Sequence, residues 1–277
     1  MIRLEQRDYN KLDPKSYAIE KRRLQVELLK LQEDVIKNKR KVCICFEGRD
    51  GAGKSSTIKF FSEYLIPKSL KYVHLGVPTK WESSHWLQRW NKALPKKGEI
   101  AFLDRSWYTR ALIEPVMGYC TEKQYRKFMN EVVPWEQGLI SRGMEIVKFY
   151  FSISKDQQKI RFNARKSSDL KYWKFSENDS RVIDRFDSFT LYKEQMFEKT
   201  THEISPWIVI NANNKMIARL SALRYLLNRI DYKDKKLLKP VKWSSNLNNF
   251  SISIDGVLFD QLSYEQYQAI SKYAEVE

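Results

Sequence analysis

Short apolar runs alternate with longer segments of mixed polarity along most of the chain. The mixed segments place apolar residues three and four positions apart, which is the period of a helix. The short runs predict buried strands, and they span residues 42–46, 71–76, 100–103, 145–153 and 207–210. Strands separated by helices are typical of a parallel sheet covered on both faces. The pattern therefore predicts an α/β fold whose ligands bind beyond the carboxyl ends of the strands.

The predicted helices fill the stretches between these strands. They span residues 17–37, 56–65 and 82–94, a region after Asp104 that ends at Met117, and residues 122–140. A charged region at 155–200, interrupted at 169–176, and a last segment that ends near residue 230 follow. Pro134 is expected to kink or break its helix, because proline lacks an N–H donor and its ring clashes with the preceding turn.

The first predicted helix has one apolar face, formed by Leu24, Leu28, Leu31 and Val35, and a basic opposite face. A basic amphipathic helix can lie on a membrane. Four acidic residues dilute its charge, however. We therefore favour a helix that packs onto the fold ahead of the first strand.

These elements divide the chain into three predicted parts. Residues 1–40 form an N-terminal arm, irregular up to about residue 16, and the first helix. Residues 41–232 form the core, with a lid at about 160–180, and residues 233–277 form a C-terminal extension. Within the extension, a hairpin is expected around residues 250–259, turning at Asp255-Gly256, a favoured hairpin dipeptide.

Composition indicates a soluble protein. Of the 277 residues 42% are apolar, which suffices for a substantial core. No run approaches 18 uncharged apolar residues, and the first residues lack the apolar segment of a signal peptide. We therefore expect a cytoplasmic protein with no membrane partner. Cys43, Cys45 and Cys120 form neither a disulfide framework nor a zinc pattern, and the three histidines are scattered.

The charge balance points to an anionic partner. Fifty Lys and Arg residues oppose 34 Asp and Glu, which leaves a net charge of +16. Nucleic acid, an anionic membrane or another polyanion would match such an excess. Basic side chains can also simply solvate a surface, but self-repulsion on this scale favours a polyanionic ligand.

A phosphate-binding loop is the strongest motif in the chain. Residues 48–55 match the P-loop pattern G-x-x-x-x-G-K-[ST], directly after a predicted strand and directly before a predicted helix. Its glycines allow successive N–H groups to curl around phosphate oxygens at a helix N-terminus. Lys54 would supply a mobile positive charge, and the Ser55 hydroxyl is the expected Mg²⁺ ligand. The predicted phosphate-binding residues are Gly48, Arg49, Gly51, Ala52, Gly53, Lys54, Ser55 and Ser56.

A second part of the site is predicted where the strand at 100–103 ends. Asp104 follows this apolar run. In P-loop proteins the Walker B acid has the same position, and it holds Mg²⁺ together with a P-loop hydroxyl. Asp is also common after strands because it favours turns. The interpretation of Asp104 as a metal ligand therefore depends on the P-loop that precedes it. Arg105 would face the same opening, and Glu114 lies on the next predicted helix.

The charged region after residue 155 fits a lid over the phosphates. Arg161 and Arg165 are four residues apart, so they share one helical face and are expected to converge on one polyanion. Lys166, Lys171 and Lys174 follow. A solvated basic helix is the alternative interpretation of this spacing.

The chain resembles the family-2 polyphosphate kinases, P-loop enzymes that transfer phosphoryl groups between inorganic polyphosphate and nucleotides. The resemblance covers about residues 17–231, and ordinary nucleotide kinases share only its P-loop. It departs from the family pattern at Gly51, Lys80 and Thr109, which bears on substrate preference rather than on the reaction. The matching stretches are Leu24–Gln32, Phe46–Ser55, Trp86–Trp90, Leu94-Pro95, Gly98–Ile100, Asp104–Tyr108, Arg110-Ala111, Glu114–Gly118, Ser152–Ser154, Trp173-Lys174 and Asp179.

The resemblance implies a P-loop kinase-like three-layer α/β/α sandwich with a helical lid, and it implies site residues. Asp50, Ser55, Asp104 and Glu114 would act with Mg²⁺, for which Mn²⁺ is an alternative. The basic positions that match the family and would clamp the phosphates are Arg105, Arg165, Lys166 and Lys174. Further candidates for contacts with the polyphosphate are Arg89, Arg110, Arg161 and Lys171. The loop sequence resembles the subgroup that phosphorylates nucleoside diphosphates to triphosphates. The family association also suggests a homo-oligomer, with a tetramer as one candidate.

Two other functions are compatible with parts of the sequence. A nucleoside monophosphate kinase that uses ATP would share the P-loop and lid, but it explains neither the charge nor the Asp104–Tyr108 motif. A P-loop ATPase that binds nucleic acid would explain the charge and the tryptophans, but no RNA- or DNA-binding module is visible. The sequence thus favours a polyphosphate donor steered by a basic channel, with no nucleic-acid partner.

Overall fold

The structure is a computed structural model that describes residues 1–4, 14–170, 172, 177–236, 250–254 and 257–262. Its main feature is a parallel sheet of six strands in the order β1-β6-β5-β2-β4-β3. The strands are β1 (Ile2–Arg3), β2 (Lys41–Gly48), β3 (Leu70–Val73), β4 (Glu99–Asp104), β5 (Met144–Ser152) and β6 (Trp207–Asn211). The predicted parallel α/β sheet is therefore confirmed.

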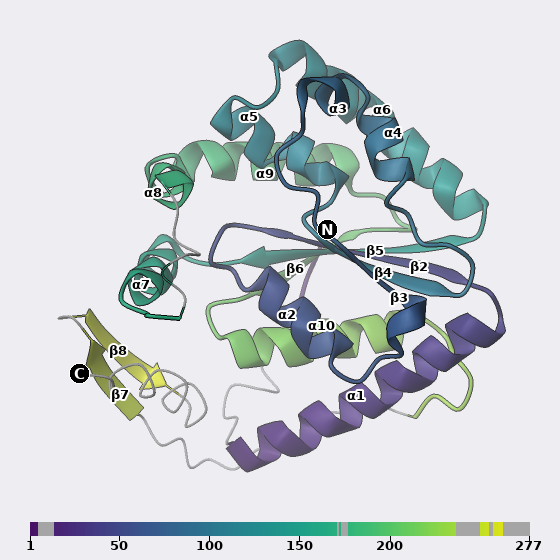
Figure 1. Ribbon diagram of the computed structural model, residues 1–277, viewed down its shortest axis with the longest axis horizontal. Coiled ribbons are helices and arrows are strands. Elements are labelled where there is room, and N and C mark those ends of the chain that lie inside the picture. Colours follow the sequence, from purple (N-terminus) through teal and green to yellow (C-terminus); the bar gives the residue numbers. More distant parts are fainter. Residues whose placement is uncertain (5–13, 171, 173–176, 237–249, 255–256, 263–277) are drawn as a thin grey trace.

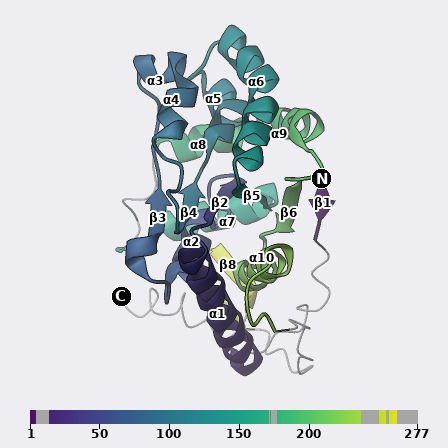
Figure 2. The same ribbon diagram turned by 90° about the vertical axis from the view of Figure 1, so that its right-hand side faces the viewer.

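Helices cover both faces of this sheet (Figures 1 and 2). One layer holds α1 (Pro14–Lys37), α2 (Lys54–Ser62) and α10 (Lys215–Arg229). The other holds α3 (Lys80–Ser84), α4 (Trp86–Asn91), α5 (Ile113–Met117), α6 (Glu122–Ser141) and α9 (Phe186–Thr200). Beyond the carboxyl end of β5 lie α7 (Lys155–Lys166) and α8 (Glu177–Asp184). The described residues also include two 3-10 turns, η2 (Pro67–Ser69) and η3 (Trp107–Ala111).

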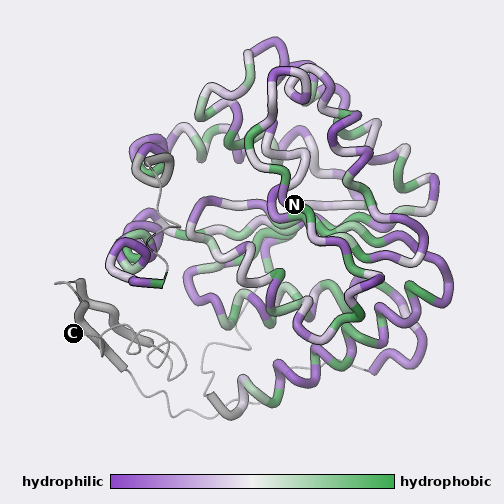
Figure 3. Tube along the Cα trace, viewed as in Figure 1, coloured by the Kyte–Doolittle hydropathy of each residue, from purple (hydrophilic) through white to green (hydrophobic). Residues whose placement is uncertain are grey.

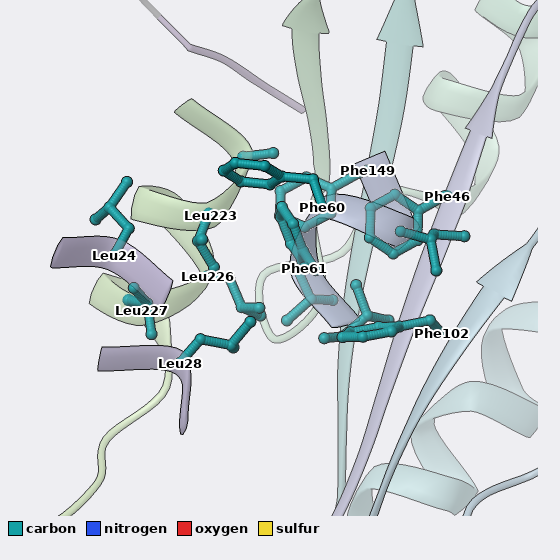
Figure 4. Close-up of a cluster of buried hydrophobic side chains, with 14 of the residues drawn as sticks. Leu24, Leu28, Phe46, Phe60, Phe61, Phe102, Phe149, Leu223, Leu226 and Leu227 are labelled. Carbon is teal, nitrogen blue, oxygen red and sulfur yellow. The ribbon is translucent and has the colours of Figure 1, made fainter. Parts of the chain in front are cut away.

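The alternation of side chains along the strands builds two cores. Phe46 and Phe149 point toward α2 and α10, where they meet leucines of α1 and α10 (Figure 4). Cys43 and Cys45 point to the opposite layer and pack with Trp107. Because residues two apart share one face of a strand, both thiols serve as buried packing groups, as predicted. The hydropathy-coloured trace shows the same arrangement, with apolar strands inside and polar segments on the outer helices (Figure 3).

Four predictions of local structure need correction. The arm is not wholly irregular, because β1 adds a short edge strand beside β6. The first helix begins at Pro14, since proline suits the first helical position. The helix expected at 82–94 is split into α3 and α4, because His85 leaves the helical conformation (φ −124°, ψ 48°). Of the two outcomes expected at Pro134, the break is not found, because Pro134 lies inside α6; a kink there stays a prediction.

The predicted C-terminal hairpin is present. β7 (Phe250–Ile254) pairs antiparallel with β8 (Val257–Leu262). Its expected turn at residues 255–256 and the residues after 262 lie outside the described part of the chain. Within the described residues, no helix is long and apolar enough to cross a membrane.

Candidate active site

The P-loop joins β2 to α2 at the carboxyl edge of the sheet. Gly48 has a φ of 137°, and a Cβ built on it would lie 2.3 Å from the Phe151 carbonyl oxygen, so no other residue fits without moving β5. Gly53 caps α2 in the left-handed conformation, with a φ of 94°. These two glycines let the main chain turn tightly at the N-terminus of a helix, where N–H groups and the helix dipole favour an anion.

Lys54 reaches across the mouth of this loop. Its side chain is buried, and its Nζ donates to the carbonyl oxygens of Gly48 at 2.9 Å and Arg49 at 3.1 Å. Burial lowers the pKa of the Lys54 amine, while the carboxylates of Asp50 and Asp104 lie close enough to oppose that shift. The lysine thus lies within reach of both predicted acids, with its charge directed at the loop that would hold phosphate.

An ion pair joins the P-loop to the residue after β4. Arg105 Nη2 donates to Asp50 Oδ1 at 2.5 Å. Burial opposes ionisation, but Arg105 and Lys54 hold the pKa of Asp50 below its ordinary value. Arg105 itself has a φ of 67°, a conformation that costs a non-glycine residue about 1–3 kcal/mol. This strained backbone conformation directs the Arg105 guanidinium toward the P-loop.

Asp104 ends β4 beside this pair, and its side chain is buried. The Tyr72 hydroxyl, at the end of β3, donates to Asp104 Oδ2 at 3.0 Å. Burial and the adjacent carboxylate raise the pKa of Tyr72 to about 12, so the phenol stays protonated and continues to donate. His74 Nδ1 lies 3.2 Å from the Asp104 carbonyl oxygen. Tyr72, within β3, and His74, directly after it, were not predicted as site residues, although parallel pairing places this strand next to β4.

A buried carboxylate supports the same edge and was also missed. Glu47 precedes Gly48, and it accepts hydrogen bonds from Ser106 N at 2.6 Å and Ser106 Oγ at 2.8 Å. Burial raises its pKa, against the effect of these hydrogen bonds. Glu47 thereby fixes the turn after β4 relative to the P-loop. A charged residue at the end of an apolar run was the signal available in the sequence.

Comparison with known proteins identifies the family. Residues 11–238 match the family model described as Polyphosphate kinase 2. The chain belongs to the polyphosphate kinase 2 family. It is 43% identical over 220 residues to a GDP-polyphosphate phosphotransferase of Mycolicibacterium smegmatis, covering 79% of this chain and 78% of that one. It is 41% identical over 212 residues to ADP-polyphosphate phosphotransferase 2 of Rhizobium meliloti, covering 76% of this chain and 69% of that one.

Solved structures agree with this assignment. The crystal structure of Polyphosphate Kinase 2 from Arthrobacter aurescens superposes with a TM-score of 0.72 at 28% identity, over 78% of this chain and 81% of that one. A putative polyphosphate kinase 2 from Pseudomonas aeruginosa gives a TM-score of 0.75 at 30% identity, over 80% of this chain and 49% of that one. The predicted P-loop kinase-like sandwich and the predicted class of enzyme, a polyphosphate-dependent nucleotide kinase, are confirmed.

The side chain of Arg49 does not lie with the phosphate-binding groups of this polyphosphate kinase. Its guanidinium stacks 3.5 Å from the ring centroid of Phe186 and 4.7 Å from that of Phe189. Nη2 donates to the Phe186 carbonyl oxygen at 3.0 Å and to Thr190 Oγ1. Arg49 therefore contributes its main chain to the loop, while its side chain fastens the loop to α9.

Arg161 likewise differs from the expected phosphate clamp. Its Nη1 donates to the Gly51 carbonyl oxygen at 2.8 Å, and its Nη2 to those of Ala212 at 2.6 Å and Asn213 at 2.8 Å. The buried Arg161 thus holds the P-loop against the β6–α10 turn, and the expected convergence of Arg161 and Arg165 on one polyanion stays a prediction. Arg165 lies within electrostatic reach of Asp50.

The remaining lid lysines are only partly described. Lys166 is exposed at the end of α7. Lys171 and Lys174 lie outside the described residues.

Three other predicted site residues form a buried network. Arg110 Nε pairs with Glu114 Oε2 at 2.5 Å, and Thr109 Oγ1 donates to Glu114 Oε1 at 2.9 Å. Arg89 Nη2 donates to the carbonyl oxygens of Leu75 at 3.0 Å and Gly76 at 2.8 Å. These contacts brace the loops beside the site and engage both oxygens of Glu114. Roles of Glu114, Arg89 and Arg110 toward metal or substrate stay predictions.

The P-loop serines divide their tasks. Ser56 Oγ donates to the Gly53 carbonyl oxygen at 2.9 Å, so it stabilises the start of α2. Ser55 is exposed at the mouth of the loop.

The donor set suits a magnesium ion that keeps water ligands. Among the described residues, no three His, Cys, Asp or Glu side chains gather closely enough to hold a metal alone. Mg²⁺ is characteristically bound by one or two carboxylates together with phosphates and waters. Asp50 and Asp104 both lie within electrostatic reach of Arg105, so two carboxylates lie near each other at the carboxyl edge of the sheet. With the Ser55 hydroxyl they fit such an ion.

Proposed function

We propose that this polyphosphate kinase transfers the terminal phosphoryl group of inorganic polyphosphate to a nucleoside diphosphate. The terminal P–O–P bond of the polymer breaks, and a new bond forms to an oxygen of the acceptor β-phosphate. The products are a nucleoside triphosphate and a polymer one phosphate shorter, and the reaction is reversible. Relatives named for GDP and ADP support a diphosphate acceptor.

One observation carries this proposal: the P-loop, Lys54, the Asp50–Arg105 pair and Asp104 meet at the carboxyl edge of β2 and β4. Phosphoryl transfer requires chiefly alignment and neutralisation of charge on the transferred group. The loop N–H groups and Lys54 would bind the terminal donor phosphates. Arg105 would neutralise oxygens of the transferred group, and Asp104 would orient the acceptor side.

Mg²⁺ is the proposed cofactor, with Mn²⁺ as an alternative, and Asp50, Ser55 and Asp104 are the residues that would hold it. When bound, it would neutralise charge on the bridging phosphates. The homo-oligomer, with a tetramer as one candidate, and the cytoplasmic location stay predictions.

The experiment is an initial-rate comparison of AMP, ADP, GMP and GDP as acceptors of phosphate from polyphosphate. We expect triphosphate from both diphosphates, at rates at least tenfold above those of the monophosphates. Chelation of divalent ions with EDTA is expected to abolish the rate, and added Mg²⁺ to restore it, because carboxylates and phosphates face each other across the site. Absence of Mg²⁺-dependent triphosphate at every chain length would reject the proposal, and ATP-dependent phosphorylation of AMP would favour the monophosphate kinase.

The Arg49 contacts give a second prediction. Arg49→Lys is expected to lower kcat/KM for ATP formation about tenfold, because lysine keeps the charge but loses both the ring stacking and the planar hydrogen-bond fork. Steady-state kinetics with polyphosphate as the varied substrate measures the effect. Arg126→Lys, at an exposed arginine on α6, is the matched control and should behave as wild type. Equal kinetics for both variants would mean that the α9 contact does not position the loop.

A further inference from the structure

The helix α7 contacts the P-loop through its buried side chains, which are Gln158, Arg161 and Phe162. Gln158 Nε2 donates to the Asp50 carbonyl oxygen at 2.8 Å, and Arg161 Nη1 donates to that of Gly51 at 2.8 Å. The Phe162 ring lies 3.3 Å from where a Cβ on Gly51 would stand. The helix therefore contacts the loop at two adjacent residues. Gln158 has no role in the site described so far.

Asp50 and Gly51 are the central residues of a tight turn. Ala52 N donates to the Arg49 carbonyl oxygen at 3.1 Å, which closes a β-turn over these four residues. Gly51 has a φ of 80°, whereas the φ of Asp50 is not positive, so the turn is of type II. Types I and II differ mainly in which way the central peptide faces, and glycine can adopt the conformation that either type requires. The orientation of this peptide therefore depends on what its carbonyl oxygen contacts.

The hydrogen bond from Gln158 selects one of the two orientations. A trans peptide directs its C=O and its N–H to opposite sides. Because the Asp50 carbonyl oxygen is held by α7, the Gly51 N–H points away from that helix, as the N–H groups of a phosphate-binding loop must. The rotated peptide would instead direct a carbonyl oxygen at the phosphate, and the two would repel each other.

Stability alone does not account for a glutamine at position 158. The side chain is fully buried, and its Oε1 has no hydrogen-bond partner among the described residues. A buried acceptor without a donor is costly, and an apolar side chain of similar length would avoid that cost. The glutamine therefore lowers stability at one end of its amide group and supplies a hydrogen bond to the P-loop at the other.

We propose that Gln158 is a positioning residue for the phosphate donor. Its bond to the Asp50 carbonyl oxygen presents the Gly51 N–H to a phosphate at the reacting end of the polyphosphate. This inference rests on the proposed function and adds a residue outside the P-loop motif to the same site. Gln158 acts through the main chain and touches no substrate, so its loss weakens binding of the donor and leaves binding of the acceptor unchanged.

The kinetic test uses Gln158→Met, which keeps the approximate length of the side chain and removes its donor. KM for polyphosphate is expected to rise about tenfold, while KM for ADP stays within about twofold of wild type. The melting temperature should stay the same or rise, because the unpartnered oxygen is removed as well. Gln158→Glu keeps the shape, but an ionised carboxylate only accepts hydrogen bonds, so it should raise KM for polyphosphate at least as much. Gln157→Met makes the same substitution at a half-buried neighbour and should behave as wild type.

The signal of one amide group reports on the peptide directly. The chain has 9 glycines, so labelling glycine alone with ¹⁵N gives a simple spectrum, and Gly51→Ala identifies the Gly51 signal by its absence. Added tripolyphosphate should move the Gly51 amide proton of wild type downfield, because a hydrogen bond to a phosphate oxygen deshields it. In Gln158→Met saturated with tripolyphosphate, this shift should be smaller.

The outcomes separate this inference from the proposed function. An unchanged KM for polyphosphate in Gln158→Met would overturn the inference. Equal losses for polyphosphate and ADP together with a lower melting temperature would also overturn it, because the bond would then only anchor α7. If wild type forms no triphosphate from polyphosphate, the proposed function fails, but the amide signal still tests Gln158. The same Gly51 shift in wild type and Gln158→Met, or no shift in wild type, would then reject the positioning role.

Discussion

Replacing Asp104 by asparagine is expected to lower kcat for ATP formation by about 10²- to 10³-fold while leaving the fold intact. Asparagine has the same shape, and its carbonyl oxygen can still accept the Tyr72 hydrogen bond. The variant loses only the negative charge, which the proposed metal and the acceptor side of the reaction require. Activity and melting temperature measured on the same preparation would separate a chemical defect from unfolding.

Tyr72→Phe provides the control for this prediction. It removes the hydrogen bond at 3.0 Å and keeps the carboxylate, so we expect a loss of less than tenfold in kcat. If Asp104→Asn instead retains more than a tenth of wild-type activity, Asp104 has no direct part in the reaction. A larger loss of kcat in Tyr72→Phe than in Asp104→Asn would mean that the Tyr72 hydroxyl contributes more to the reaction than the Asp104 charge.

Lys148→Met is expected to reduce the free energy of unfolding by about 3–5 kcal/mol. Lys148 and Glu136 are both fully buried and are joined at 2.9 Å. Lys148 Nζ also donates to the Tyr108 hydroxyl at 3.2 Å and to the Thr200 carbonyl oxygen at 3.0 Å. Removing the lysine leaves a buried carboxylate without its cation, which is why the cost exceeds that of an ordinary core substitution. Urea unfolding followed by tryptophan fluorescence measures it.

The double variant Lys148→Met/Glu136→Gln tests the cause. Glutamine retains an acceptor for the Trp107 indole and removes the unpaired charge, so we expect it to recover at least half of the lost stability. No recovery would assign the defect to packing around the methionine rather than to charge.

The same pair predicts how stability depends on pH. Burial opposes ionisation of Glu136, but Lys148, His202 and Trp107 hold its pKa below the ordinary carboxyl value. A group whose folded-state pKa is depressed stabilises the fold above its unfolded pKa, and that contribution is lost as pH falls through the folded pKa. Wild type should therefore lose stability with acidification below about pH 4.5 more steeply than the double variant.

The sequence predicted the frame of the site well because local patterns determine it. The apolar runs before Gly48 and Asp104 predict buried strands of a parallel sheet. Because parallel strands end at the same edge, the sequence also predicts that these two residues lie near each other. β1 was missed because two residues carry no periodicity. The split at His85 was missed because the helical spacing of Trp86 and Trp90 indicated a helix, but both residues lie after the break, so their spacing carries no information about it.

The functions of individual arginines could not be predicted in the same way. Arg49 and Arg161 stand in segments that were predicted to bind phosphate. The guanidinium of Arg49 instead contacts an aromatic pair, and that of Arg161 contacts main-chain carbonyl oxygens. Whether an arginine meets a ligand or a carbonyl depends on what tertiary packing brings opposite it. Tyr72 and Glu47 depend on the same information, because their partners are 32 and 59 residues away in sequence.

The ion pair between Arg105 and Asp50 has a consequence for selectivity. The Arg105 guanidinium already pairs with the Asp50 carboxylate. An incoming anion must therefore compete with that carboxylate for the guanidinium. Orthophosphate or sulfate would bind Arg105 weakly, as a single ion. A polymer held by other contacts would present its phosphates to Arg105 at a high local concentration. We therefore expect the pair to disfavour the binding of abundant small anions at Arg105.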